Sequence, residues 1–373
     1  MVKKILKWGG IGLGWLIGMA IITMVISSYL RVPLPPVVYG TSFDPGYAKF
    51  LGFDPQKVFQ TIVGEWQFKY VRLPAHWEAV EPELGKFNFG GLDWFMDEAG
   101  KNDVKVMLAL GQKTPRWPEC HLPEWARELS RKDYENALLN YEKTVIERYK
   151  DHPALEIWQL ENEPFLSFGD RCPSYSRKLL RREIAQLRAI DRGHQNLISD
   201  SGELSLWTRT SPATDLFGTT LYRRVWNPVF GYWSYDFLPI GHYRAKLWLN
   251  GRSLNTMFIS ELQAEPWIAN GSILTNTIEE QYKSMSPAQL KKNINFANRL
   301  GVSRAYLWGA EWWYWLREQG KGEEILDHIK ELKKSPAVNE AASINPFRIL
   351  DEDPDWASQE PDELVDWTGV GVD

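Results

Sequence analysis

Short apolar or β-branched runs alternate with longer helical patterns along the middle of the chain. The runs that read as strands are Val37–Ser42, Phe68–Leu73, Val104–Leu110, Leu155–Leu160, Asn196–Ser199, Leu216–Leu221, Thr256–Ser260 and Ala305–Trp308. Amphipathic stretches such as Tyr134–Tyr149, Tyr175–Ile190 and Ala288–Leu300 lie between them. This alternation favours parallel βαβ units, and eight such units close into a (β/α)8 TIM barrel. We expect the barrel to occupy residues 38–348.

The N-terminal pattern is different, because residues 8–30 carry no charge and follow the basic segment 1–7. A helix of this length can span a bilayer of roughly 30 Å. A cleaved signal peptide is the alternative, but Ser27–Leu30 makes a poor cleavage site. The sequence therefore predicts a transmembrane anchor that contacts the lipid bilayer through residues 8–30. Because lysines precede the span, the N-terminus should be cytoplasmic and the barrel outside a single-pass cell-membrane protein.

The two ends of the chain account for its net charge of −5. Bases without acids occupy the first 31 residues, and acids without bases occupy the last 23, whereas the middle of the chain is balanced. A neutral body excludes nucleic acid as a partner. Residues 31–37 read as a proline-rich spacer, and residues 349–373 as an acidic, disordered tail. We expect a monomer.

Aromatic and sulfur-containing residues bear on the chemistry. The chain has 19 tryptophans, which suit either an aromatic core or a platform for flat ligands such as sugars. Six scattered histidines and two cysteines show no metal-ligand spacing, so we expect no metal and no cofactor. Cys120 and Cys172 lie on loops after the third and fourth strands, which are neighbours in a barrel, and we expect them to form a disulfide.

The residues at the carboxyl ends of the strands decide what such a barrel does. These ends carry carboxylates, amides, one arginine and aromatic residues: Arg72, His76, Trp77, Gln112, Asn162, Glu163, Tyr222, Glu261 and Trp308. Two carboxylates across a pocket are what cleavage of a glycosidic bond requires. One must stay protonated to donate to the leaving oxygen, and the other must be ionised to attack.

These segments resemble clan A glycoside hydrolases. Residues 158–164, Trp-Gln-Leu-Glu-Asn-Glu-Pro, are similar to the Asn-Glu-Pro signature of the fourth strand, and residues 258–263 resemble the nucleophile segment of the seventh. Residues 77–89 are similar to the region after the second strand in glycoside hydrolase families 5, 42 and 10. The resemblance covers roughly residues 38–335 and implies a retaining glycosidase acting on oligo- or polysaccharides.

The resemblance also implies roles for individual residues. Glu163 would be the general acid/base, Glu261 the nucleophile, and Asn162 a hydrogen-bonding partner of the sugar 2-hydroxyl. Arg72 and Tyr222 would contact Glu261, and Trp308 would form the floor under the reacting sugar. We expect three further substrate contacts, from His76, Trp77 and Gln112.

The sequence departs from family 5 at two positions, since Gln112 and Thr220 stand near where that family has histidines. The expected function is a membrane-anchored, extracytoplasmic glycosidase that cleaves β-linked O-glycosides by double displacement. A transglycosylase that remodels surface glycans and a catalytically silent glycan-binding barrel are the alternatives.

Overall fold

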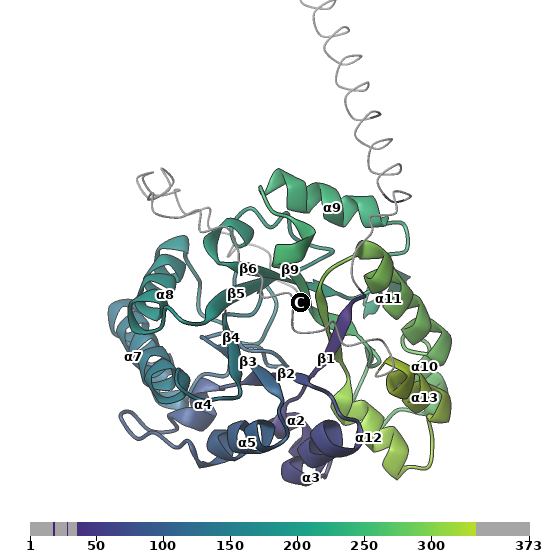
Figure 1. The fold of residues 1–373 in the computed structure, drawn as a ribbon, viewed down its shortest axis with the longest axis horizontal. Coiled ribbons are helices and arrows are strands. Elements are labelled where there is room, and N and C mark those ends of the chain that lie inside the picture. Colours follow the sequence, from purple (N-terminus) through teal and green to yellow (C-terminus); the bar gives the residue numbers. More distant parts are fainter. Residues whose placement is uncertain (1–17, 19–27, 29–35, 333–373) are drawn as a thin grey trace, which may run out of the picture. The chain divides into compact units, whose positions relative to one another are not determined.

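The computed structural model describes residues 18, 28 and 36–332, and its centre is a closed barrel of eight parallel strands (Figure 1). The strands follow one another around the barrel in the order β1-β10-β9-β6-β5-β4-β3-β2. Their bounds are β1 Val38–Ser42, β2 Tyr70–Pro74, β3 Lys105–Leu110, β4 Leu155–Leu160, β5 Gln195–Asp200, β6 Leu216–Leu221, β9 Met257–Gln263 and β10 Arg304–Trp308. The prediction of a TIM barrel is confirmed.

Two further strands form an antiparallel hairpin between β6 and β9 that the sequence pattern did not predict. They are β7 Arg224–Asn227 and β8 Gly231–Ser234. The side chains of this hairpin are largely half-buried, so the hairpin lacks the strong alternation of apolar and polar residues that would reveal it.

Helices surround the barrel (Figure 1). They are α2 Pro45–Phe50, α3 Pro55–Gln60, α4 Trp77–Val80, α5 Gly90–Lys101, α6 Glu124–Arg127, α7 Arg131–Tyr149, α8 Arg177–Ile190, α9 Ile240–Leu249, α10 Ile278–Tyr282, α11 Pro287–Leu300, α12 Ala310–Glu318 and α13 Glu323–Leu332. Short helical turns lie at Thr61–Glu65, Ser211–Ala213 and Leu254–Thr256.

The ends of these helices follow local chemistry. Ser130, Ser176 and Ser286 accept backbone N–H bonds at the starts of α7, α8 and α11. Helix α11 has Pro287 in its first turn and ends at Gly301, whose φ of 85° is left-handed. Glycine adopts this conformation at little steric cost, and the predicted start and end of this helix are confirmed.

Two apolar layers hold the barrel together. The inner layer fills the barrel with Met107, Ile157, Leu197, Leu216, Phe258 and Tyr306, all buried. The outer layer packs the other faces of the strands against the helices. The inner layer closes the interior below the mouth, so chemistry is confined to the carboxyl ends of the strands.

Strand β9 contains a bulge at Ser260 and Glu261. Residue 259 pairs with Thr219, but the next pair joins Glu261 to Thr220, and the register with β10 shifts at the same place. Phe258 belongs to the inner layer and Leu262 to the outer one. The extra residue therefore allows both Ser260 and Glu261 to face inward, where regular alternation would turn one of them out.

The predicted anchor at residues 8–30 lies outside the described residues except for Gly18 and Ser28, as does the predicted tail at residues 349–373. Within the described part of the chain, no helix combines the length and apolar character needed to cross a bilayer.

Candidate active site

Glu261 is held by two partners at the mouth of the barrel. The Arg72 guanidinium donates from Nη1 to Oε1 of Glu261 at 2.6 Å, and the Tyr222 hydroxyl donates to Oε2 at 2.8 Å. Arg72 is 1% exposed and Glu261 is 4% exposed, so solvent screens this ion pair little. Both oxygens of Glu261 are thus hydrogen-bonded, one to a guanidinium and one to a hydroxyl group.

Arg72 also joins Glu261 to the end of β4. Its Nη2 donates to Oδ1 of Asn162 at 2.9 Å, and its Nε donates to Oε1 of Gln159 at 2.7 Å. The Ser199 hydroxyl donates to the same Asn162 oxygen at 2.8 Å. One guanidinium thus fixes the predicted nucleophile and the predicted sugar-binding amide relative to each other.

The chain turns sharply directly after β4, which ends at Leu160. Glu161 and Glu163 both have positive φ, 60° and 47°. The Glu161 carboxylate accepts hydrogen bonds from the backbone N–H groups of Gln112 and Lys113 at 2.6 and 2.8 Å. Because the strand ends at Leu160, Asn162 and Glu163 are not bound by the alternation that turns adjacent strand residues to opposite faces.

Glu163 lies in a different environment from Glu261. It is 8% exposed, and it accepts a 2.8 Å hydrogen bond from the Thr220 hydroxyl. Burial raises its pKa well above the ordinary value, and the nearby carboxylates of Glu261 and Glu119 raise it further. Glu163 is therefore a carboxylic acid that retains its proton to an unusually high pH.

Glu119 is a site residue that the sequence analysis missed. Its Oε2 accepts a 3.1 Å hydrogen bond from Asn162 Nδ2, and burial, followed by the charge of Glu261, raises its pKa to about 7. It follows the cis Trp117–Pro118 peptide on the loop after β3. Its neighbour Cys120 forms the predicted disulfide with Cys172, with 5.4 Å between the Cα atoms. In the sequence, Cys120 was the only residue of this segment that had been singled out for a structural role.

A second group of polar residues forms one wall of the mouth. His76 bonds through Nε2 to Asp44 Oδ2 at 2.6 Å and through Nδ1 to Thr114 Oγ1 at 2.7 Å, and its ring stacks on His121. Burial lowers the pKa of His76, and His121 lowers it further. Burial alone would raise the pKa of Asp44, but His76 and Arg116 outweigh it and lower that pKa to about 2. His76 lines a cavity of about 610 Å³.

Arg116 occupies the space beside Trp308. Its guanidinium lies 4.2 Å from the Trp308 ring and 4.0 Å from the Tyr47 ring, and it forms ion pairs with Glu265 and Glu311. Trp308 is 7% exposed. One face of this tryptophan is therefore covered by the arginine, and its role as a sugar floor stays a prediction.

Two predicted substrate contacts, Trp77 and Gln112, have side chains buried among other parts of the protein. Trp77 is fully buried at the start of α4, where it stacks on Tyr141 and donates from Nε1 to Glu81. Gln112 is 1% exposed, and its side chain donates to the Pro173 carbonyl and accepts from the Tyr134 hydroxyl. Both side chains pack behind the pocket, because the partners named above belong to helices and loops outside the barrel mouth.

Comparisons with known proteins match part of this chain to glycosidases. The model of the family described as beta-galactosidase, glycoside hydrolase family 42, matches residues 60–201, which include Arg72 and Glu163. The beta-galactosidase Pbg of Clostridium perfringens is 36% identical over 105 residues, which cover 23% of this chain and 15% of that protein. The chain thus matches only a small part of the length of this curated relative.

Solved structures share the fold at low sequence identity. Xylanase 10B of Thermotoga maritima has a TM-score of 0.50 at 17% identity, over 74% of this chain and 83% of that chain. A glycoside hydrolase family 5 mannosidase of Rhizomucor miehei has a TM-score of 0.51 at 13% identity, over 75% and 83%. The relatives in these comparisons are glycosidases, and the predicted resemblance to TIM-barrel glycoside hydrolases of clan A, with sequence similarity to family 42 in residues 60–201, is confirmed.

Proposed function

We propose that this protein is a retaining glycosidase that cleaves β-linked O-glycosides by double displacement. Glu261 attacks the anomeric carbon and forms a glycosyl-enzyme, while Glu163 gives its proton to the leaving oxygen. Glu163, now a carboxylate, then removes a proton from the water that releases the sugar. Asn162 hydrogen-bonds the 2-hydroxyl of the reacting sugar.

The observation that carries this proposal is the opposite surroundings of the two glutamates. Arg72 and Tyr222 donate to both oxygens of Glu261, which orients this carboxyl group and places a positive charge beside it. Glu163 accepts a bond from the Thr220 hydroxyl and has a raised pKa, which favours a proton donor. A carboxyl group paired with an arginine, beside a second carboxyl group that keeps its proton, suits the nucleophile and acid roles of a glycosidase.

Alanine substitution of each glutamate tests the two roles. On a dinitrophenyl β-glycoside, whose leaving group needs no proton, the Glu163→Ala variant should give a burst of dinitrophenol followed by slow turnover that azide accelerates. The Glu261→Ala variant should lose activity on every substrate. On a substrate with a poor leaving group, either loss should lower the rate by about 10³ to 10⁶, equivalent to roughly 4–8 kcal/mol. Stopped-flow release of dinitrophenol separates the two steps.

The Glu147→Ala variant is the control, because the Glu147 side chain is 52% exposed on α7 and pairs with Lys143, away from the proposed site. It should retain the burst and the steady state. If the burst and the azide response belong to the Glu261 variant, the roles are reversed. If neither glutamate matters on a substrate that the wild type cleaves, the proposal fails.

The substrate panel follows from the relatives. Aryl β-galactosides, β-mannosides and β-xylosides, with the corresponding polysaccharides, cover the sugars named for the similar proteins. Proton NMR of the first-formed product should show the same anomer as the substrate.

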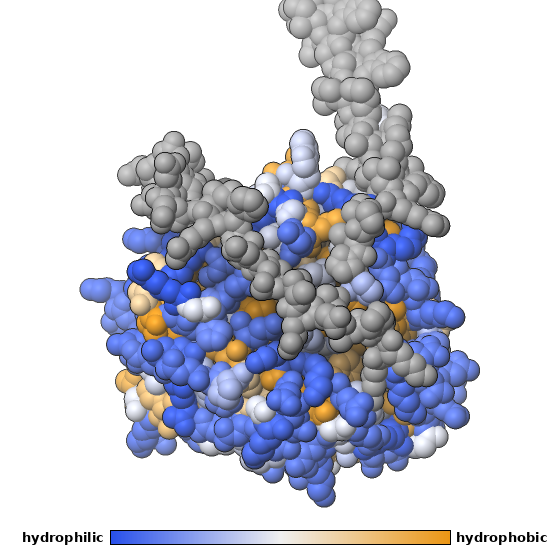
Figure 2. All heavy atoms as spheres, in the orientation of Figure 1, coloured by the Kyte–Doolittle hydropathy of each residue, from blue (hydrophilic) through white to orange (hydrophobic). Residues whose placement is uncertain are grey.

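We further propose that residues 8–30 anchor the barrel to the outer face of the cell membrane. The Gly241 N–H at the start of α9 donates to the Ser28 hydroxyl at 2.8 Å, so the end of the apolar stretch contacts this helix. Figure 2 shows hydrophobic surface near α9 within a mostly hydrophilic face. Large hydrophobic side chains that are exposed in residues 230–249 are Phe230, Trp233, Phe237, Trp248 and Leu249. Aromatic residues at this position suit the interface of a bilayer.

A further inference from the structure

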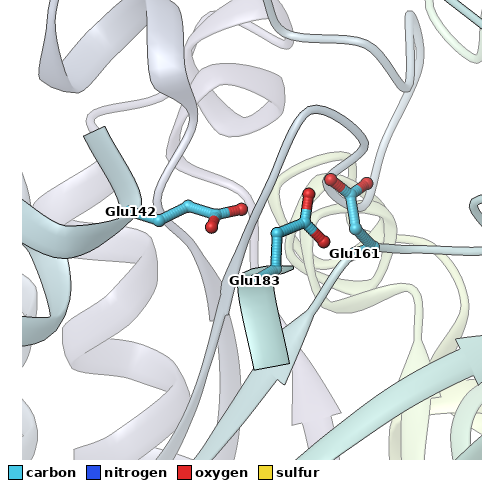
Figure 3. A group of neighbouring side chains, drawn as sticks. All are labelled: Glu142, Glu161 and Glu183. Carbon is cyan, nitrogen blue, oxygen red and sulfur yellow. The ribbon is translucent and has the colours of Figure 1, made fainter. Parts of the chain in front are cut away.

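Three glutamates outside the proposed catalytic pair converge in the interior. They come from separate elements: Glu142 from α7, Glu183 from α8 and Glu161 from the turn after β4 (Figure 3). Each offers a carboxylate oxygen, and these oxygens lie within 4.8 Å of one another. All three residues are 0% exposed.

Glu142 is the unexplained member of the group. Among the residues that the structure describes, no N–H or O–H group donates to either of its carboxylate oxygens, although the residue is fully buried. Figure 3 shows its carboxylate pointing toward Glu183, which lies between the other two. A buried carboxylate without partners costs several kcal/mol, so a side chain kept in this orientation needs a compensating group.

The other two glutamates have donors but also spare acceptor capacity. Glu161 accepts two backbone N–H bonds, and Glu183 accepts one bond from the Tyr175 hydroxyl at Oε2, while its Oε1 has no donor. Each carboxylate oxygen has two lone pairs, so all three side chains can still bind a cation.

Nearby cationic side chains are engaged elsewhere. The Lys113 ammonium donates to the backbone carbonyls of Glu163, Leu166 and Phe168. Arg182 pairs with Glu135. The charges of Lys113 and Arg182 act on Glu161 and Glu183 from a distance, but neither base forms an ion pair with any of the three glutamates.

We propose that Glu142, Glu161 and Glu183 form a binding site for one calcium ion. Oxygen-only ligands select a hard cation. Calcium accepts several carboxylates in flexible geometry, whereas magnesium demands a near-ideal octahedron and usually keeps several waters, so three fully buried carboxylates favour calcium. The ion would bind no substrate. It would fix Glu161, and through it the turn that carries Asn162 and Glu163.

Metal binding to the purified full chain tests the site directly. After treatment with EDTA and its removal, calorimetric titration with CaCl₂ should give one ion per chain, and the Tm should rise with calcium concentration. Magnesium should bind more weakly. Terbium should replace calcium and emit on excitation of tyrosine, because Tyr175 contacts Glu183, and added calcium should quench that emission.

Substitution of the unpartnered glutamate locates the ion. Glu142→Gln keeps the size of the side chain and removes its charge, and it should weaken calcium binding by at least on the order of 10- to 100-fold. Glu147→Gln, on the exposed face of the same helix, is the matched control and should bind calcium like the wild type. Two results overturn the proposal: a wild-type chain that binds neither calcium nor terbium, or a Glu142→Gln chain that binds calcium as tightly as the wild type. If the Glu142→Gln variant fails to fold, the calcium titration and the terbium emission of the wild type still test the proposal.

Discussion

Glu163 and Glu119 are neighbouring acids whose pKa values are both raised, and the charge of Glu119 contributes to the raised pKa of Glu163. Glu163 must be protonated to act as an acid, so its raised pKa extends activity to higher pH rather than lower. Part of that rise comes from the negative charge that Glu119 acquires above its own pKa of about 7. The upper limit of the pH profile therefore depends on Glu119 as well as on Glu163 itself.

Glu119→Gln should shift the alkaline limb of kcat/KM to lower pH. The amide keeps an oxygen for the Asn162 bond but removes the charge that disfavours ionisation of Glu163. The measurement is kcat/KM against pH on a phenyl β-glycoside, whose leaving group needs the proton. A dinitrophenyl glycoside is the internal control, and its profile should lack this limb. A limb that stays in place in the variant, or that moves to higher pH, contradicts the coupling.

Sequence motifs predicted the central residues but not their surroundings. Arg72, Asn162, Tyr222 and Glu261 lie together as expected, because the carboxyl ends of neighbouring parallel strands meet at one end of a barrel. Arg116 and Glu119 could not be predicted in the same way. They come from an irregular loop in which both have positive φ, and their partners are distant in sequence.

At the level of elements, the predicted strands differ from the observed ones by three residues or fewer at each end. Buried parallel strands are short apolar runs, so their positions can be read from sequence. The largest difference is at β9, which continues three residues beyond Ser260. Glu261 and Gln263 are polar residues inside a strand, where they face the mouth of the barrel, and polarity alone suggested that the strand had already ended.

The disulfide joins the loops that follow β3 and β4 across 52 residues of chain. Replacing both cysteines with serine should lower the free energy of unfolding by about 2–4 kcal/mol, because the unfolded chain gains conformational freedom. Urea unfolding followed by tryptophan fluorescence measures this change. Reduced wild type should unfold at the same urea concentration as the double variant. Equal midpoints for oxidised wild type and the double variant would mean that the bond adds no stability.

For the whole molecule, the predicted orientation places the two ends of the anchor on opposite sides of the membrane. In cells without an outer membrane, a membrane-impermeant maleimide should label a Lys321→Cys variant, because this exposed position belongs to the barrel. It should label a Lys4→Cys variant only after the cells are permeabilised. The native cysteines are bonded to each other and do not react. Equal labelling of both variants in intact cells would refute the orientation.

The bulge in β9 has a consequence for how this site can change over evolution. Because one additional residue sets which way the chain faces from Glu261 onward, the position of the nucleophile is encoded by the length of the strand as well as by the identity of the residue. Straightening the bulge without changing the sequence would turn Glu261 away from the pocket, whereas deleting Ser260 would restore regular alternation and leave Glu261 facing inward and Leu262 outward. Substitutions can explore this pocket one side chain at a time, whereas the bulge lets β9 lose one residue at this point and still present its nucleophile to the pocket.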